Sequence, residues 1–453
     1  LIPVNMFYVS QSITDRLSAE AFYQLSWKQT VVDNCGTFFS GADVAADGCN
    51  NGYHLLNGQL TQLIAGIDQH PLLPNMSDLG INYSSEGLRI SRGKDRKAGD
   101  SGQWGLALRW MGDNTEYGAY VMNYHSRTPF LSMQNAQMDA TTLGQMAAAG
   151  DALYAGAQGA MTQAQASQLG AAAVLVGNGR YLMDYPEDLR LYGLSFSTTL
   201  PTGTAWQGEI SYRPNAPVQI NTQDMTLALA TGIGTDVAKA QAYEAAAGAA
   251  VGAGEYAQAA ALGALAQQHL GAAMAQGNAI QKGYKRKDII QLQTTFTHFF
   301  DQVLGAERAT VVGEIGYVHV GGLESKRKLR YGRDPIYGSP ESMIPDVPHA
   351  REVNGWKGFV TKNAWGYRVR GQLDYSDVFA GVNLKPNMAF SHDVEGYGPN
   401  GLFNEGSKAV SIGLDADYRH TYTAGLSYTN FFGGRYNTLK DRDFVSLTFG
   451  MNF

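Results

Sequence analysis

Apolar and polar residues alternate one by one along much of this chain. The clearest case is the last segment, DFVSLTFGMNF, in which every second residue from Val445 to Phe453 is apolar and the residues between are small or polar. This alternation predicts a β-strand with one apolar and one polar face. It fits a strand that lines the core of a soluble protein, and it equally fits a strand that crosses a membrane between lipid and a polar lumen.

The same pattern recurs in about 13 segments of about 10 to 14 residues, the length that a tilted strand needs to cross a bilayer. Links between the segments alternate between short ones, such as PTG at 201–203, and long ones, such as 215–286. Outer-membrane barrels separate short turns from long loops in this way. The pattern therefore predicts an all-β fold, a transmembrane antiparallel β-barrel that forms one domain over 1–453. Because bacterial single-chain barrels have even strand numbers, we expect strands before Leu1 and about 14 to 18 in the full protein.

The final strand suggests how such a barrel is recognised during assembly. We interpret Phe449, Met451 and Phe453 as a terminal aromatic signal for the barrel assembly machinery of the outer membrane.

Composition narrows the class further. The chain has no uncharged apolar run of the length that a membrane helix needs, and its mean hydropathy is −0.23. A net charge of −6 gives no basic footprint for nucleic acid. These features leave the barrel as the membrane-crossing element.

The chain has two cysteines, Cys35 and Cys49, in the segment NCGTFFSGADVAADGC. Their short spacing in a loop rich in Gly and Asp predicts a disulfide, which requires an oxidising compartment. Closing a loop of about 15 residues stabilises a fold by roughly 3 kcal/mol in the chain-entropy model. Two free thiols are the alternative, and a metal site lacks further ligands.

Two long loops contain Ala-rich segments at about 133–180 and about 235–277. Alanine is the strongest helix former, so we predict helices there, with Thr235 and Asp236 capping the second. A third helix is predicted at QLTQLIAGI, where Leu60, Leu63, Ile64 and Ile67 share a face. The helices would form a cap over the barrel or fold inward as a plug. A disordered low-complexity loop is the alternative.

Parity along the strands assigns polar residues to the lumen. In YGAYVMNYHSR (117–127), an outward face of Tyr120, Met122 and Tyr124 places the polar residues between them inside. The lumen residues predicted in this way are Arg109, Asn123, His125, Arg127, Glu209, Arg213, Glu314, Arg368 and Arg370. They form either a functional constriction or the ordinary hydrogen-bond network of a wide barrel.

A basic run, ESKRKLRYGR, occupies 324–333 in a long loop. Its residues Lys326, Arg327, Lys328 and Arg330 are candidates for contact with lipopolysaccharide phosphates. A solvated loop is the alternative explanation.

No motif for enzymatic chemistry stands out. The chain contains no Gly-x-Ser-x-Gly elbow, no His-Glu-x-x-His, no phosphate loop and no dinucleotide fingerprint. We therefore expect neither an enzyme nor a cofactor or metal site.

Several segments resemble a known family: IPVNMFYVSQS, AFYQLSWKQTVVDNCGTFFS, GAYVMNYHSRTP and GEISYRPNAPVQINTQD. The chain is similar to the C-terminal three-quarters of a member of the proteobacterial outer-membrane family catalogued as domain of unknown function thirteen-hundred-and-two. That resemblance implies an outer-membrane location, and partners that include a periplasmic lipid-binding protein and an inner-membrane exporter. It also implies traffic in hydrophobic compounds or lipids. It supplies no catalytic residues.

The sequence thus favours an outer-membrane transport protein that passes hydrophobic compounds or lipids through a helix-capped barrel, in contact with outer-membrane lipid and lipopolysaccharide. A surface binding or receptor protein with a closed lumen is the alternative. Substrate, direction and oligomeric state do not follow from the sequence.

Overall fold

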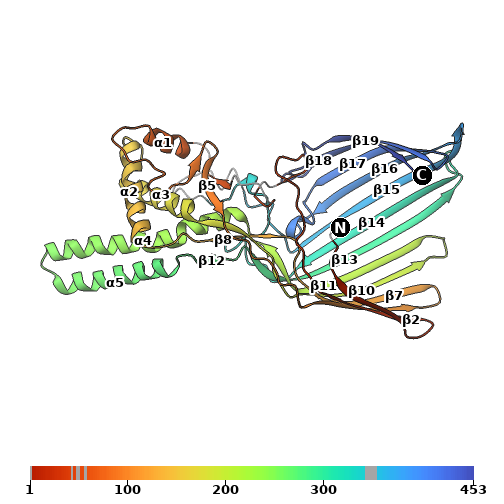
Figure 1. Ribbon diagram of the computed structural model, residues 1–453, viewed down its shortest axis with the longest axis horizontal. Helices are drawn as coiled ribbons and strands as arrows, with labels where there is room; N and C mark the ends of the chain where they lie inside the picture. Colours follow the sequence, from red (N-terminus) through yellow and green to blue (C-terminus); the bar gives the residue numbers. More distant parts are fainter. Residues whose placement is uncertain (1–2, 42–43, 47–51, 56–58, 342–354, 453) are drawn as a thin grey trace.

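The computed structural model consists of a large curved sheet and a helical head at one end of it (Figure 1). It describes all residues except 1–2, 42–43, 47–51, 56–58, 342–354 and 453. The curved sheet is the wall of the barrel, and its strands run obliquely along the long axis of the molecule.

The wall is a 13-stranded sheet in which each strand pairs antiparallel with its neighbour, and β1 and β19 lie at its two edges. The strand number predicted from the alternation is therefore confirmed. Its strands, in order, are β1 Met6–Ser12, β2 Leu17–Gln24, β6 Gln103–Met111, β7 Thr115–Tyr124, β10 Leu189–Thr199, β11 Ala205–Gln219, β13 Tyr284–Asp301, β14 Arg308–Val320, β15 Asn363–Phe379, β16 Val382–Glu395, β17 Ser407–Tyr418, β18 Tyr422–Gly433 and β19 Phe444–Met451.

The convex face of the wall carries large apolar side chains that remain exposed. Trp104 and Trp110 on β6 are 43% and 49% exposed, and Phe449 on β19 is 78% exposed. A continuous face of this kind would be unstable in water, whereas lipid is its natural environment. Together with strands of up to 18 residues, it confirms the fold class as a transmembrane antiparallel β-barrel.

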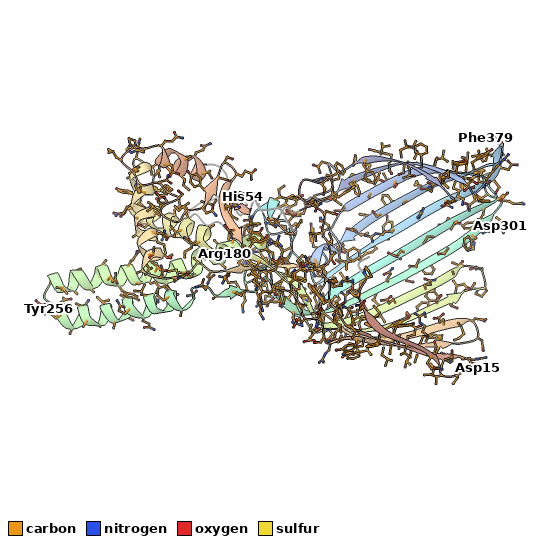
Figure 2. All side chains as sticks on the ribbon, viewed as in Figure 1. Asp15, His54, Arg180, Tyr256, Asp301 and Phe379 are labelled. Carbon is orange, nitrogen blue, oxygen red and sulfur yellow. The ribbon has the colours of Figure 1, made fainter. Side chains whose placement is uncertain are left out.

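The ends of the wall differ as the sequence predicts. Turns at one end span 13–16, 112–114, 200–204, 302–307, 380–381 and 419–421, whereas loops at the other span 25–102, 125–188, 220–283, 321–362, 396–406 and 434–443. Figure 2 labels Asp15, Asp301 and Phe379 at the short-turn end, opposite the head.

The head is built from the first three long loops. It has a second sheet with strand order β12-β8-β9-β5-β3 and β4 paired to β5. These strands are β3 Tyr53–Leu55, β4 Tyr83–Ser84, β5 Gly87–Arg92, β8 Phe130–Gln134, β9 Arg180–Asp184 and β12 Ile280–Gln281. Its helices are α1 Gln59–Asp68, α2 Ala140–Gly156, α3 Gln163–Asn178, α4 Thr222–Gly252 and α5 Tyr256–Ala275.

The Ala-rich segments are helical, but α4 begins at Thr222 and not near Thr235. Its N-cap is Asn221, whose side chain accepts from the Asp224 amide. The proposed cap at Thr235 and Asp236 is wrong, because both residues lie inside the helix. No described helix is both long and apolar enough to cross a membrane.

Helices α4 and α5 pack against each other as a hairpin that points away from the barrel (Figure 1). Figure 2 shows Tyr256 at the tip, where its side chain is 70% exposed. The hairpin therefore does not cover the barrel, contrary to the simplest form of the predicted cap.

One hydrophobic core runs from the head into the barrel. It includes Ile64 of α1, Leu153 of α2 and Leu175 of α3, all fully buried. It also includes Ile289 and Val318, which belong to the wall. Head and barrel are consequently joined by one continuous buried cluster.

Candidate functional site

The interior of the barrel at its loop end, called the mouth here, is lined by apolar side chains. Ile289, Val318, Val320 and Ala364 are each at most 3% exposed. Phe403, from the β16–β17 loop, belongs to the same buried cluster. Its ring takes the space above Gly316, because a Cβ added there would lie 3.2 Å from the Phe403 Cζ. Apolar packing thus closes this part of the interior.

Beside this packing lies a cavity of about 570 Å³, called the mouth cavity. Strands β2, β6, β7, β10, β11 and β13 supply its wall, and the 3-10 helix η2 (Pro399–Gly401) supplies a further side. Its lining residues are Gln24, Gln103, Tyr124, His125, Ser126, Arg127, Thr128, Phe130, Leu189, Arg213, Ala216, Pro217, Ile289, Gln291, Pro399, Asn400, Gly401 and Leu402. This size lies in the range of about 300 to 1,000 Å³ typical of ligand sites.

Asn400 fixes η2 against the opposite wall of the barrel. Its side-chain amide donates to the Pro217 carbonyl at 3.0 Å, and its Oδ1 accepts from the Gln219 amide at 3.2 Å. Asn400 has a φ of 52°, a conformation that asparagine tolerates better than most residues. These two bonds tie the β16–β17 loop to β11 across the interior.

His125 lines the mouth cavity, and its side chain serves to hold neighbouring segments together. Its Nε2 lies 2.8 Å from the Ser101 carbonyl, and its Nδ1 accepts from the Asp188 amide at 3.0 Å. Its own amide donates to Gln103 Oε1. Because both ring nitrogens are engaged and the residue is 3% exposed, the imidazole holds three segments together. Arg127 also lines the cavity and donates from Nε to the Lys28 carbonyl.

The parity predicted for β7 is wrong. The register pairs Asn123 with Trp104, and residues paired directly across antiparallel strands share a face. Asn123 therefore lies on the outward face, where it donates to Asp188 Oδ1 at 3.0 Å. Tyr120 lies inside, with its hydroxyl 3.0 Å from Ser195 Oγ. Tyrosine suits either face, since it has an apolar ring and a polar tip, and alternation alone misassigned it.

Arg213 lies inside as predicted, at a β-bulge. The pairing of β11 with β13 shifts between Arg213 and Ala216. Bulges re-aim side chains, and here the shift turns Ala216 and Val218 into the buried interior. No hydrogen bond or ion pair to the Arg213 guanidinium occurs among the described residues, and its Nε is buried without a partner. An unpaired cation thus lines the mouth cavity.

Deeper in the barrel the interior is polar. Arg109 lies 3.7 Å from Glu20 and from Glu116, and Arg368 lies 3.7 Å from Asp393. These lengths indicate loose, hydrated pairs, which contribute little to stability.

Two smaller spaces lie among these polar groups. One of about 270 Å³ is lined by residues that include Glu116, Tyr120 and Glu209. Another of about 250 Å³ is lined in part by Arg368 and Arg370. Glu314 accepts from Gln293 at 2.7 Å. Arg109, Glu209, Glu314, Arg368 and Arg370 thus face this polar part of the interior, whereas His125, Arg127 and Arg213 line the mouth cavity.

The basic run divides into buried and exposed residues. Arg330 is 5% exposed, pairs with Asp224 and Glu341, and lies over the rings of Trp356 and Phe359. A buried, paired guanidinium cannot contact lipopolysaccharide, so Arg330 is removed from that proposed surface. Arg327 and Lys328 are exposed and Lys326 is half-buried.

Glu324 forms the other charged centre of this loop. Its carboxylate accepts from Lys285, Lys287 and Tyr331 at 3.2, 2.8 and 2.6 Å. Burial alone would raise the pKa of Glu324, but the hydrogen bonds from Lys287 and Tyr331 outweigh it and lower the pKa to about 2. The same contacts raise the pKa of Tyr331, for which burial is the largest cause. This cluster ties the 321–362 loop to the first residues of β13.

Two sequence predictions lie partly beyond the described residues. Cys49 and Phe453 are outside them, so the Cys35–Cys49 disulfide and the terminal recognition aromatic stay predictions. Phe449 and Met451 belong to β19, where they are 78% and 55% exposed on the outward face.

Sequence reasoning missed Gln103, Asn400 and Phe403. Gln103 is a polar residue on a barrel strand that is only 2% exposed. Asn400 and Phe403 come from a short loop, GYGPNGLFNEG, that shows no periodicity. The Pro-Asn-Gly sequence signals a turn, but nothing in it shows that the turn crosses the barrel.

The fold and this interior define a membrane β-barrel with a head on its loop side. Within that class, the chain belongs to the family described as protein of unknown function (DUF1302), whose model matches residues 1–453. No match was found among curated proteins.

Among solved structures, the chain is similar to a mutant ferric enterobactin receptor, PfeA, of Pseudomonas aeruginosa in complex with enterobactin (TM-score 0.29, 10% identity, covering 94% of this chain and 40% of that chain). It is also similar to a Pseudomonas aeruginosa FadL homologue (TM-score 0.30, 11% identity, covering 95% of this chain and 70% of that chain). The chain spans 40% of the length of the receptor. Similarity at this level carries over neither ligand nor partner.

Proposed function

We propose that this protein resides in the outer membrane and passes hydrophobic compounds or lipids through the interior of its barrel. Outward apolar faces on the strands support the membrane location. The transported compound would enter or leave the barrel by the mouth, where apolar side chains extend from the head core into the barrel.

The mouth cavity is the observation that carries this proposal. Phe130, Leu189, Ile289 and Leu402 give part of its lining an apolar surface at the junction between head and lumen. A general porin for ions and sugars needs a wide aqueous mouth lined by charge, whereas a pathway for apolar solutes needs apolar surface that shields them from water.

The test measures entry of an apolar fluorescent probe, N-phenylnaphthylamine, into vesicles that contain the reconstituted protein. Leu402→Trp and Ala216→Trp both fill the mouth cavity and are expected to slow entry several-fold. Ala119→Trp is the matched control, since Ala119 pairs with outward Leu108 on the lipid face. Heat-modifiable migration checks that each variant is folded. Equal entry with and without the protein would refute transport.

A closed-lumen receptor is the second candidate, and one observation favours it. The packing of Phe403 against Gly316 closes part of the interior, and the α4–α5 hairpin offers an extended surface away from the membrane. Under this alternative, the cavity-filling variants leave probe entry at the level of empty vesicles, as does the unaltered protein.

Transport between membranes requires soluble and inner-membrane components. We therefore include a periplasmic lipid-binding protein, an inner-membrane exporter and the barrel assembly machinery among the proposed partners. Arg327 and Lys328 remain exposed cations for lipopolysaccharide. No residue is proposed as catalytic.

A further inference from the structure

The charges around the mouth cavity are of one sign. Its lining contains Arg127 and Arg213, and it contains neither Asp nor Glu. Elsewhere in the barrel the situation differs, since Arg109 and Arg368 each lie within 4 Å of a carboxylate. Among the described residues, the lining of the mouth cavity thus carries positively charged side chains and no carboxylate.

Arg213 is the central group in this respect. Its Nε is buried and lacks a partner, and no described residue forms an ion pair with its guanidinium. Burying part of a cation without compensation is costly. Arg213 lies on a paired strand of the wall, next to the register shift between Arg213 and Ala216.

Gln103 supplies a second unsatisfied donor on the same cavity. Gln103 is only 2% exposed, and its Nε2 has no partner among the described residues. Its Oε1 is already used, because it accepts from the His125 amide. The orientation of the amide is therefore set by that bond, and what remains free is a donor. His125 offers no further donor, since both ring nitrogens are engaged.

Part of the remaining wall is apolar, beside polar residues such as Gln24, Gln291 and Asn400. Phe130, Leu189 and Ile289 are 5%, 3% and 3% exposed, and Leu402 adds a side chain from η2. Two donors without acceptors among the described residues, on the lining of a cavity that also has apolar side chains, match a molecule that has an anionic head and an apolar chain. A neutral hydrocarbon would leave both donors unsatisfied, and a cationic amphiphile would be repelled by Arg213.

We propose that the mouth cavity binds an amphiphile with a single anionic head group, a carboxylate or a phosphate, through Arg213 and Gln103, with its chain against Phe130, Leu189 and Ile289. This inference rests on the proposed function and specifies its substrate class. A guanidinium pairs well with either head group through parallel N–H···O bonds.

The test uses the full chain in neutral nanodiscs at pH 8 and measures binding of radiolabelled dodecanoate. Competition by four unlabelled probes separates the components of recognition: dodecyl phosphate, 1-dodecanol, acetate and inorganic phosphate. We expect dodecanoate and dodecyl phosphate to bind at least tenfold more tightly than 1-dodecanol, and the two head groups alone not to compete. Competition by acetate or inorganic phosphate at equal concentration would instead indicate a simple anion site and overturn the proposal.

Variants of Arg213 and Gln103 then test whether these two side chains bind the head group. Arg213→Gln is expected to weaken dodecanoate binding about tenfold or more, the usual loss for a charge-assisted hydrogen bond, and to leave 1-dodecanol unchanged. Gln103→Leu gives an independent, smaller loss, should Arg213→Gln not fold. Arg370→Gln is the matched control, because Arg370 faces the lumen outside the mouth cavity. Unchanged dodecanoate binding in folded Arg213→Gln would overturn the assignment.

Failure of this inference and failure of the proposed function give different results. Entry of N-phenylnaphthylamine that depends on the mouth cavity, together with equal affinity for dodecanoate and 1-dodecanol, would retain apolar transport and reject the anionic head group. Tight dodecanoate binding without any probe entry would retain the site and reject transport.

Discussion

The Arg330 guanidinium holds the Asp224 carboxylate at two points, with Nε 2.7 Å from Oδ2 and Nη2 2.7 Å from Oδ1. Asp224 lies in the first turn of α4, and Arg330 lies in the loop between β14 and β15. Ser339 adds a hydrogen bond of 3.1 Å to the same carboxylate. The pair therefore anchors the start of the longest helix to a loop of the barrel.

Removing one member of this pair should destabilise the head. Asp224→Ala leaves the buried Arg330 guanidinium with Glu341 as its remaining carboxylate, and breaking a buried pair in this way costs up to roughly 3 to 5 kcal/mol. We expect faster hydrogen exchange along the first half of α4, measured by mass spectrometry on the full chain. Arg327→Gln, which alters an exposed neighbour, should leave exchange unchanged. Protection that is equal in both variants would contradict an anchoring role.

The 321–362 loop should lose stability only when the pH falls below about 4.5. The pKa of Glu324 is lowered from 4.5 to about 2 in the folded protein. A lowered carboxyl pKa stabilises the fold fully above the unfolded value, and that contribution disappears as pH falls from about 4.5 toward about 2.

The measurement is the melting temperature between pH 7 and pH 2.5. The unaltered protein should lose more stability across this range than Glu324→Gln, which cannot titrate. Parallel curves for the two proteins would show that Glu324 does not contribute. At pH 7 the substitution should lower the melting temperature, because Lys285 and Lys287 lose their counter-charge.

The β16–β17 loop, and not the α4–α5 hairpin, should control ion conductance. Replacing 398–402 by a short Gly-Ser link removes η2 and its bonds to β11, and is expected to raise single-channel conductance above that of the intact protein. Replacing 244–266 by a tight turn shortens the hairpin and should change nothing, because the hairpin points away from the barrel. The reverse result would restore the hairpin as the cap.

The last residues should govern assembly. Phe453→Ala is expected to reduce the amount of heat-modifiable protein in outer-membrane fractions, since it removes the terminal aromatic. Phe300→Ala is the matched control, because Phe300 is an outward aromatic at the short-turn end of the wall, where β19 ends at Met451, and is 46% exposed. A similar reduction in both variants would point to lost lipid contact as the cause.

The cysteines should form a bond. Alkylation of the purified, unreduced protein is expected to add no mass, and alkylation after reduction should label Cys35 and Cys49. Labelling of both thiols without reductant would show that they are free.

The wall of the barrel could be predicted from the sequence because its signals are local and repeated. Each strand shows its own alternation, and loop lengths give the two ends. The start of α4 could not be predicted, because residues such as Met225, Leu229 and Ile233 become helical by burial in the head core, although Gly232 and Gly234 weaken the local propensity.

The site was less accessible to prediction for a different reason. Arg213 was assigned to the interior, but its lack of a partner depends on six strands and a loop meeting in space. Arg330 belongs to a basic run in the sequence, which suggests exposure. It is buried in the structure, where it pairs with Asp224, a residue distant in sequence. Neither the missing partner of Arg213 nor the Arg330–Asp224 pair produces a periodic pattern in the sequence.

The sheet of the head has a consequence for the order of events during folding. Strand β5 comes from the loop before β6, β9 from the loop before β10 and β12 from the loop before β13, yet they belong to one sheet. Its parallel pairing of Ser91 with Arg180 joins residues far apart in sequence, which is slow to form because loop closure must come first. The head sheet is therefore complete only when all three loops have come together, so loss of register in any one of the hairpins beneath it would disturb a sheet that the other two share.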